Sequence, residues 1–371
     1  MSPPNTPRLA QQPIKALYII LFTLTALFRV PLILFRRIPP YFRPRESWSY
    51  RQAISNDLTK FFFNFLSNIR MAPARSLEGG AEADIFSVID AAPATFYKAP
   101  LTKSSIFPTQ VGGLWLPERY DPAKHGNSRI ILHFHGGAYV VLSPRAAAVQ
   151  WGPRMLCKEL SSAIAFCPEY RLSSNPNGTF PAAIQDAVTA YRFLLEDQHI
   201  DASRIVFSGD SSGGHLVISL LRYLTHNEGL LPLPTAALLH SPWLDLTEDG
   251  TTVEKSSNAK SDYLSNSLLQ WGAETFIPDG MAPDSEFISP FYHPFALKVP
   301  IWTQAGTAEI FYDKIELWVD KMKQCEGNRV QLHGVKDGMH DVFAAGGDFG
   351  MKDEALAAAQ SAVGFLNSID N

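Results

Sequence analysis

The sequence GDSSGG at residues 209–214 constrains the fold of this chain more than any other stretch. It follows the apolar run 204–208 (RIVFS), typical of a buried strand, and precedes 216–221 (LVISLL), typical of a helix on a sheet. A Gly-x-Ser-x-Gly at a strand-to-helix junction is the nucleophile-elbow pattern, whose glycines allow a turn too tight for a Cβ atom. The turn places Ser211 at a helix N-terminus, where negative charge is favoured. A glycine-rich turn without chemistry fits the same letters, so the interpretation requires the other parts of a catalytic site.

Composition fits one large globular domain with an appendage, since the 371 residues are 46% hydrophobic and 18% charged. The formal net charge of −4 gives no reason to expect a nucleic-acid partner. The three cysteines, Cys157, Cys167 and Cys325, are odd in number and widely spaced, so we expect free, buried thiols and no disulfide framework.

The N-terminal region predicts attachment to a membrane, which we expect to be the endoplasmic reticulum. Residues 1–13 are polar and proline-rich, so we expect disorder there. Residues 16–35 are mostly apolar, and as a helix they would be about 30 Å long, enough to cross a bilayer. Arg29 and Pro31 interrupt this stretch, so a short or tilted span and a helix lying in one leaflet both stay open. A cleaved signal peptide and a buried helix of the globular domain are the alternatives.

Two signals disagree about the side of the membrane on which the main domain lies. The basic residues after the apolar core outnumber Arg8 and Lys15, which favours a cytosolic domain. These basic residues are Arg29, Arg36, Arg37, Arg43 and Arg45. Asn177 begins a glycosylation sequon (NGT) that would matter only on the luminal side. The orientation therefore stays open.

Strand and helix patterns alternate beyond residue 105, which predicts a mainly parallel sheet with helices on both faces. Strand patterns occupy residues 113–117, 129–134, 163–167, 204–208, 235–240, 300–304 and 329–333, and helical patterns occupy 182–195, 311–325 and 352–368. Residues 48–69 are amphipathic at helical spacing, residues 71–105 read as irregular, and residues 247–296 are polar without strand periodicity.

A nucleophilic serine also needs hydrogen-bond donors for the oxyanion that forms during acyl transfer. The sequence HGGA at residues 135–138 directly follows a predicted strand. We expect the N–H groups of Gly136 and Gly137, together with that of Ser212, to be these donors. His133 and His135 have no Cys, Asp or Glu cluster nearby, so we expect no metal and no organic cofactor.

The base and its orienting acid should follow later strands. His340 lies in the loop after the last predicted strand, where a general base is expected. The loop after residues 300–304 offers Glu309 or Asp313, and Glu309 is preferred because it is nearer the strand end. The chain order is then serine, acid, histidine.

Together these residues resemble the hormone-sensitive-lipase-like family of α/β hydrolases, which includes bacterial carboxylesterases and arylacetamide deacetylases. The matching motifs are HGGA (135–138), YRL (170–172), PAAIQD (181–186), GDSSGG (209–214) and GMH (338–340). The resemblance covers roughly residues 105–368. It implies an α/β-hydrolase fold with a mainly parallel, eight-stranded sheet and a helical lid. The sequence departs from the family at Ala138, where a third glycine is usual, and at Glu309, where an aspartate is usual.

Residue by residue, the resemblance implies Ser211 as nucleophile and His340 as base, with Gly136, Gly137 and Ser212 as oxyanion donors. The supporting motif residues are His135, Ala138, Gly209, Asp210 and Gly213. The implied organisation is a disordered N-terminus (1–13), a membrane anchor (14–37), two lid parts (38–105 and 247–296) and a core (106–246 and 297–371). An anchor before the hydrolase domain is similar to arylacetamide deacetylases. Residues 48–52 (WSYRQ) are similar to fungal members, some of which are encoded beside secondary-metabolite pathways.

The expected activity is hydrolysis of a carboxylic ester of a hydrophobic small molecule through an acyl-enzyme with a short to medium acyl group. Amide deacetylation, lactone opening and acyl transfer to an alcohol use the same residues and stay open. A non-catalytic receptor on a hydrolase fold is the alternative from another class. The sequence does not indicate an oligomeric state.

Overall fold

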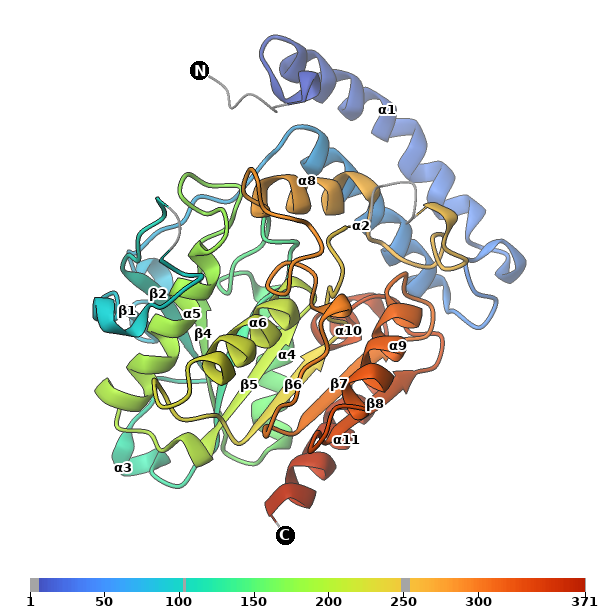
Figure 1. Cartoon of the computed structure of the whole chain (residues 1–371). Coiled ribbons are helices and arrows are strands. Elements are labelled where there is room, and N and C mark those ends of the chain that lie inside the picture. The colour runs from blue at the N-terminus through green and yellow to red at the C-terminus, as the bar shows by residue number, and fades with distance from the viewer. Residues whose placement is uncertain (1–6, 103–104, 248–253, 371) are drawn as a thin grey trace.

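An eight-stranded sheet forms the centre of the molecule in the computed structural model, which describes residues 7–102, 105–247 and 254–370 (Figure 1). The strand order is β1-β2-β4-β3-β5-β6-β7-β8. β2 is antiparallel to β1 and β4, whereas all other neighbours are parallel, which confirms the predicted mainly parallel sheet. The strands are β1 (Phe86–Ile89), β2 (Val111–Leu116), β3 (Ile130–Phe134), β4 (Ile164–Glu169), β5 (Ile205–Asp210), β6 (Ala236–His240), β7 (Ile301–Gly306) and β8 (Val330–Val335).

The central strands form where the sequence is continuously apolar. In β5, Ile205, Val206 and Phe207 are fully buried, and the strand pairs with β3 on one side and β6 on the other. A strand covered on both faces needs apolar side chains at successive positions, which is the pattern seen at residues 204–208. β5 runs two residues beyond the predicted end, so Asp210 belongs to the strand and Ser211 is the first residue after it.

Helices cover both faces of the sheet, as predicted (Figure 1). α4 and α11 lie against one face, and α5, α6 and α9 lie against the other. The helices of this core are α3 (Pro122–His125), α4 (Ala147–Glu159), α5 (Ala182–Arg192), α6 (Ser212–His226), α9 (Tyr312–Lys323), α10 (Val342–Phe349) and α11 (Lys352–Asp370).

Two further helices pack on each other above the carboxyl ends of the strands (Figure 1). α2 (Tyr50–Asn68) forms where the amphipathic pattern predicted it, and α8 (Asn266–Phe276) lies in the region read as polar. α2 begins with a capping box, in which the Ser49 side chain accepts from the Gln52 N–H and the Gln52 side chain accepts from the Ser49 N–H. The two helices come from the two segments that we expected to form a lid, and we refer to them together as the cap.

Several local predictions were wrong or lie outside the described residues. β1 lies within the segment 71–105 that was read as irregular, because a four-residue edge strand paired only with β2 is too short to show a period. Within the stretch expected to be disordered, Arg8–Ala10 form a 3₁₀ turn, while residues 1–6 lie outside the described part. The helix predicted over 182–195 ends at Arg192 and continues as a π-helical turn over Phe193–Asp197.

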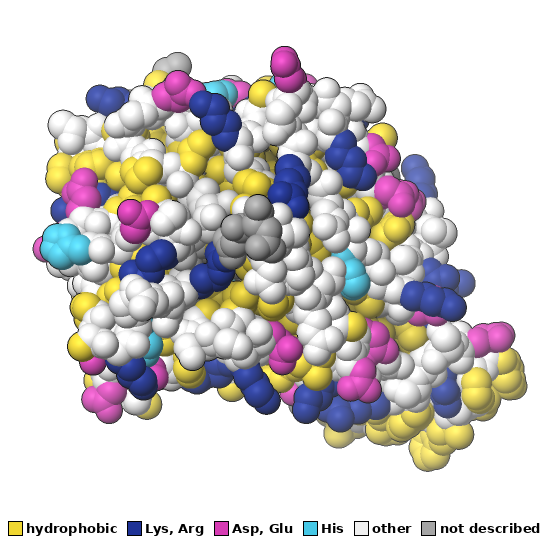
Figure 2. All heavy atoms as spheres, turned by 90° about the horizontal axis from the view of Figure 1, so that it is seen from below, with side chains coloured by type: hydrophobic (Ala, Val, Ile, Leu, Met, Phe, Trp, Pro, Cys, Tyr) yellow, Lys and Arg dark blue, Asp and Glu magenta, His cyan; other side chains and the backbone are white. Residues whose placement is uncertain are grey.

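α1 (Ile14–Arg36) is a single helix of 23 residues, none of which is buried. Among the described residues it is the one helix long and apolar enough to cross a membrane. The alternative of a buried helix of the globular domain is therefore wrong. Figure 2 shows hydrophobic side chains gathered at the corner where α1 projects, with Lys and Arg side chains beside them.

A buried ion pair joins the residues after β4 to α5. Arg171 Nη2 lies 2.8 Å from Asp186 Oδ1, and the Arg171 backbone N–H donates to Asp186 Oδ2 at 2.7 Å. The two side chains are 5% and 0% exposed. The motifs YRL and PAAIQD thus lie next to each other, and the charges of Arg171 and Asp186 neutralise one another.

We expect Asp186→Ala to lower the free energy of unfolding by about 3–5 kcal/mol, because Arg171 would remain buried without its counter-ion. Denaturant unfolding followed by circular dichroism measures this loss. Arg192→Ala is the control: it removes the more exposed Arg192–Glu196 pair and should cost less than about 1 kcal/mol. Similar losses in the two variants would contradict the role given to burial.

Candidate active site

Ser211 lies in the turn between β5 and α6 with a strained backbone. Its φ of 50° and ψ of −116° are unusual for a residue with a side chain. A Cβ atom on Gly213 would lie 1.9 Å from the Phe134 carbonyl oxygen, and one on Gly209 would lie 2.4 Å from the Gly213 oxygen. The predicted reason for both glycines is therefore confirmed.

Hydrogen bonds to neighbouring segments hold this strained turn in place. The Ser211 N–H donates to the His240 carbonyl at the end of β6 at 2.8 Å, and the Trp243 N–H donates to the Ser211 carbonyl at 3.0 Å. Ser211 is 6% exposed, so this residue of the turn is shielded from water. Strain of this kind persists only where the surroundings fix the backbone.

His340 and Glu309 meet at the same edge of the sheet, in the loops after β8 and β7. His340 Nδ1 lies 3.8 Å from Glu309 Oε1, and the two side chains are 2% and 0% exposed. Neither atom has a hydrogen-bond partner among the described residues. Asp313, the alternative acid, lies exposed on α9, so Glu309 is the carboxylate that faces the imidazole.

Ser241, which sequence reasoning missed, fixes the other oxygen of this carboxylate. Glu309 Oε2 accepts from Ser241 Oγ at 2.6 Å and from the Gly306 N–H at 2.9 Å. Ser241 Oγ in turn accepts from the Asp341 N–H at 3.0 Å, directly beside His340. One buried hydroxyl thus connects the acid loop to the loop of the base.

A loop from the second lid segment braces the acid loop. Asp262 Oδ2 accepts from the Ile310 N–H at 2.7 Å, and Ser261 Oγ donates to the Ala308 carbonyl at 2.9 Å. Asn258 Nδ2 donates to the Glu309 carbonyl at 2.8 Å. No local pattern marks these residues, because their partners lie about fifty positions away in the chain.

The electrostatic surroundings favour the protonated form of His340. Burial lowers the pKa of His340, but the carboxylate of Glu309 and the charges of Asp262 and Asp341 outweigh burial and raise it to about 9. A histidine held this way accepts a proton readily.

The structure corrects one of the predicted oxyanion donors. The Gly136 N–H donates to Asp210 Oδ2 at 2.7 Å, so it is already used. No hydrogen bond is found for the N–H groups of Gly137, Ala138 or Ser212 to any group in the described ranges. Gly137 and Ala138 both have positive φ values, of 107° and 53°.

His135 supports this loop from within. Its ring stacks on Tyr170 with centroids 4.6 Å apart, and Tyr170 Oη donates to the His135 carbonyl at 2.6 Å. His135 Nδ1 lies 2.6 Å from the Gly136 carbonyl oxygen. Burial lowers the pKa of His135 to about 4, so the ring is neutral and Nδ1 donates.

Asp210 connects three parts of the site through one buried carboxyl group. Besides the Gly136 N–H, it contacts His133 Nε2 at 3.2 Å through Oδ1. The carboxyl group of Asp341 lies near enough to interact with it electrostatically. Burial raises the pKa of Asp210 to about 6, and burial together with the nearby charge of Asp210 raises the pKa of Asp341. Because Asp210 precedes Ser211 and Asp341 follows His340, this contact brings the two loops together.

Aromatic side chains from the cap and core cover the imidazole. Tyr263 and Phe311 approach the His340 ring edge-on, with ring centroids 5.6 and 5.2 Å from that of the imidazole. Phe63 of α2 packs on Tyr263, with ring centroids 5.9 Å apart. Gly272 of α8 lies so close to the loop after β3 that a Cβ atom there would be 2.4 Å from the Ala138 oxygen. The cap therefore packs on the oxyanion loop through α8 and on Tyr263, which covers the candidate base, through α2.

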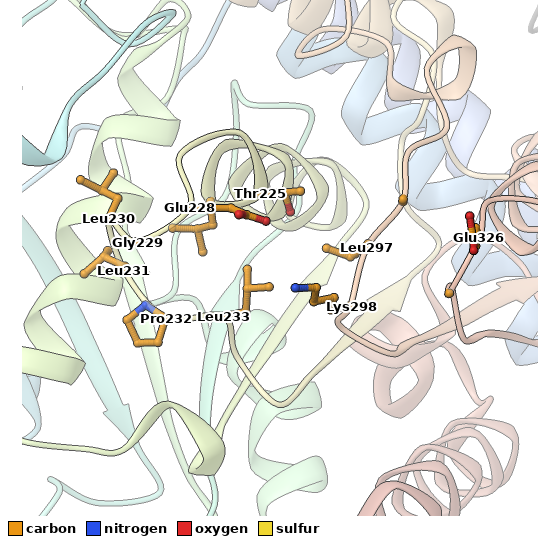
Figure 3. A pocket seen from close by; sticks show the side chains of 13 residues that line it. Thr225, Glu228, Gly229, Leu230, Leu231, Pro232, Leu233, Leu297, Lys298 and Glu326 are labelled. Carbon is orange, nitrogen blue, oxygen red and sulfur yellow. The ribbon is translucent and has the colours of Figure 1, made fainter.

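Two large pockets lie elsewhere on the described surface. One of about 820 Å³ is lined by the end of α6 and by the segments before β6 and β7 (Figure 3). It lies at the amino ends of the strands, opposite to Ser211, Glu309 and His340, so it cannot hold the reacting group. Another of about 830 Å³ lies between the end of α2, α8 and the loop that contains Asn177, which is exposed. Ser173 at its wall donates to the Tyr139 carbonyl, so this second pocket borders the oxyanion loop.

A metal ion has no evident place in this arrangement. Within residues 7–102, 105–247 and 254–370, no three His, Cys, Asp or Glu side chains gather to hold a metal ion. His133 contacts Ser208 Oγ at 3.0 Å and Asp210, and burial lowers its pKa to about 3. The three cysteines are free thiols, two of them buried and Cys325 half-buried.

Comparison with known proteins agrees with this geometry. The sequence model of a family described as "alpha/beta hydrolase fold" matches residues 131–344. An acetyl-hydrolase of Streptomyces hygroscopicus is 33% identical over 195 residues, which cover 52% of this chain and 60% of that protein. An esterase of Acinetobacter venetianus is 29% identical over 215 residues, which cover 57% of this chain and 66% of that protein. The chain thus matches less than two thirds of the length of these curated relatives.

A solved structure shares the fold over most of the chain. The crystal structure of an esterase from the bacterial hormone-sensitive lipase family superposes with a TM-score of 0.60 at 23% identity. The match covers 92% of this chain and 98% of that one.

We expect Ser211→Gly to be more stable than Ser211→Ala by about 1 kcal/mol, because glycine relieves the positive φ whereas alanine keeps the Cβ atom. Both variants lose the hydroxyl, so their comparison isolates backbone strain. Thermal unfolding of the two proteins measures the difference. A Gly variant less stable than the Ala variant would show that the turn is not strained.

Proposed function

This chain belongs to the α/β-hydrolase family, and on that premise we propose that it is a serine esterase acting on a carboxylic ester of a hydrophobic small molecule. The observation that carries the proposal is the meeting of the buried Glu309 and His340 beside the loop that carries Ser211, at the carboxyl ends of β7, β8 and β5. A nucleophile, a base and an acid in this order are the parts that acyl transfer requires.

The first half-reaction forms an acyl-enzyme. Ser211 Oγ attacks the ester carbonyl carbon while its proton moves to the neutral imidazole of His340. The negative charge on the carbonyl oxygen is stabilised by the free N–H groups of Gly137, Ala138 and Ser212. The tetrahedral intermediate then loses the alcohol, which takes the proton from His340.

The second half-reaction restores the enzyme. Water gives a proton to His340 and attacks the acyl carbon, and the resulting intermediate releases the carboxylic acid and Ser211. Glu309 keeps the imidazole in the required tautomer and stabilises its charged form. Ser241 and the Gly306 N–H hold this carboxylate in position.

The relatives' names favour an ester over the other acyl substrates. Those proteins are named an acetyl-hydrolase and an esterase, so a short acyl group is the preferred substrate class for this chain. The aromatic cover of His340 favours an apolar substrate. α1 attaches the protein to a membrane, where such esters accumulate, and the endoplasmic reticulum is the proposed location.

We expect Ser211→Ala to abolish hydrolysis of short p-nitrophenyl esters by the purified full-length protein, because the acyl-enzyme cannot form. Glu309→Gln should lower kcat by at least about a hundredfold, whereas Asp313→Asn should leave kcat nearly unchanged. Release of p-nitrophenol measures all three variants. Unchanged activity in Ser211→Ala would refute the mechanism, and a larger loss in Asp313→Asn than in Glu309→Gln would overturn the choice of acid.

We expect activity to increase with pH up to about 9, because protonated His340 cannot accept the serine proton and its pKa is raised to about 9. The acidic limb of the kcat/KM profile should therefore lie well above the ordinary histidine value of about 6.5. In Glu309→Gln the limb should move to lower pH, because the main interaction that raises the pKa is lost. An acidic limb below pH 6.5 in the unchanged protein would contradict this electrostatic account.

A further inference from the structure

α1 lies along the cap helix α2 instead of leading away from the domain. At one end, Phe22 stacks on Phe61 and Phe65 with ring centroids 4.5 and 4.1 Å apart. Asn68 Nδ2 donates to Tyr18 Oη at 3.1 Å. These contacts join the beginning of α1 to the end of α2, so the two helices run antiparallel.

Contacts continue to the other end of α1. Arg37 Nε lies 2.6 Å from Asp57 Oδ2, and Tyr50 Oη donates to the Leu34 carbonyl at 3.1 Å. The contacts therefore extend from Tyr18 to Arg37, a distance along the helix axis of about 28 Å for nineteen steps of 1.5 Å.

The opposite face of α1 carries a stripe of exposed large hydrophobic side chains. Its members recur every three or four residues and are each more than half exposed: Leu17, Leu21, Leu24, Phe28, Leu32 and Phe35. Within the described residues nothing covers this stripe. A contiguous apolar surface of this kind marks an interaction site.

Charge identifies the partner that fits this surface. Residues 1–45 contain seven basic residues and no acidic one. Arg8, Arg29 and Arg36 are exposed, at the start, middle and end of the stripe. An apolar helix face bordered by cations suits a bilayer with anionic headgroups.

The packing of α1 on α2 also determines the orientation of α1. α2 is tied to the rest of the molecule by Lys60, whose Nζ donates to the Ala259 carbonyl at 2.6 Å, and by Arg51, whose Nη2 donates to the Asp348 carbonyl at 3.0 Å. If α1 crossed the bilayer with these contacts intact, Arg51, Asp57 and Lys60 would enter the hydrocarbon with it. Charged side chains in that environment are strongly disfavoured.

We propose that α1 is an in-plane membrane helix that docks the cap on an anionic bilayer surface without crossing the bilayer. The stripe enters one leaflet, the basic side chains contact headgroups, and both chain ends stay on the same side. Docking does not depend on ester hydrolysis. If the proposed function also holds, an apolar ester reaches the cap from the leaflet, because α2 carries Phe63, which packs on Tyr263 over His340.

Flotation of the full-length protein with vesicles of phosphatidylcholine and phosphatidylserine tests the surface. The double variant Leu21→Glu with Phe28→Glu should bind more than about tenfold more weakly, since it places charges in the stripe. The matched control is Leu317→Glu, which changes a leucine that is 49% exposed on α9 and should bind as the unchanged protein does. Unchanged thermal unfolding shows that the double variant is folded. Equal binding by the double variant and the control would overturn the proposal, as would equal binding to vesicles of phosphatidylcholine alone.

The position of the two chain ends tests the orientation. The full chain, with one epitope before residue 1 and another after residue 371, is synthesised in the presence of microsomes and treated with protease from outside. For an in-plane helix we expect either cleavage of both epitopes or protection of both. Cleavage of one epitope with protection of the other would show that α1 spans the membrane and would overturn the in-plane arrangement.

Discussion

The buried carboxyl group of Asp210 is the interaction on which the rest of the candidate site depends. Its Oδ2 accepts from the Gly136 N–H of the oxyanion loop, its Oδ1 lies 3.2 Å from His133 Nε2 of β3, and its charge interacts with that of Asp341 beside His340. Burying a carboxyl group costs free energy, and the hydrogen bond from the Gly136 N–H offsets part of this cost. One buried carboxyl group thus lies between the loops that carry the proposed donors, nucleophile and base.

A second connection runs from the acid to the cap. Ser241 joins Glu309 to the loop of His340, while Asn258 and Asp262 hold the backbone of the acid loop. The loop that carries Asn258 and Asp262 precedes α8, and α8 packs on Ala138. The cap thus supports the proposed catalytic groups as well as covering them, so a movement of the cap would also affect the acid and the oxyanion loop.

The same cap is in contact with α1, so the N-terminal helix is packed on the part of the molecule that covers the candidate site. Phe22 and Phe65 connect α1 to α2, and Phe63 connects α2 to the aromatic side chains over His340. In the proposed in-plane arrangement the bilayer, the cap and the catalytic groups are neighbours. This proximity suits the proposed hydrolysis of an apolar ester that dissolves in the membrane.

The sequence alone determined the features that depend on local pattern. The apolar run before Ser211 predicted β5, the glycines on either side predicted a turn without room for a Cβ atom, and chain order predicted that Glu309 and His340 would follow later strands. Tertiary structure alone decided which groups are partners. Gly136 was predicted as an oxyanion donor, yet its N–H is bound by Asp210, 74 residues away, and Ala138 has the free N–H instead. Only the fold brings such distant groups within about 3 Å, the range in which a hydrogen bond forms.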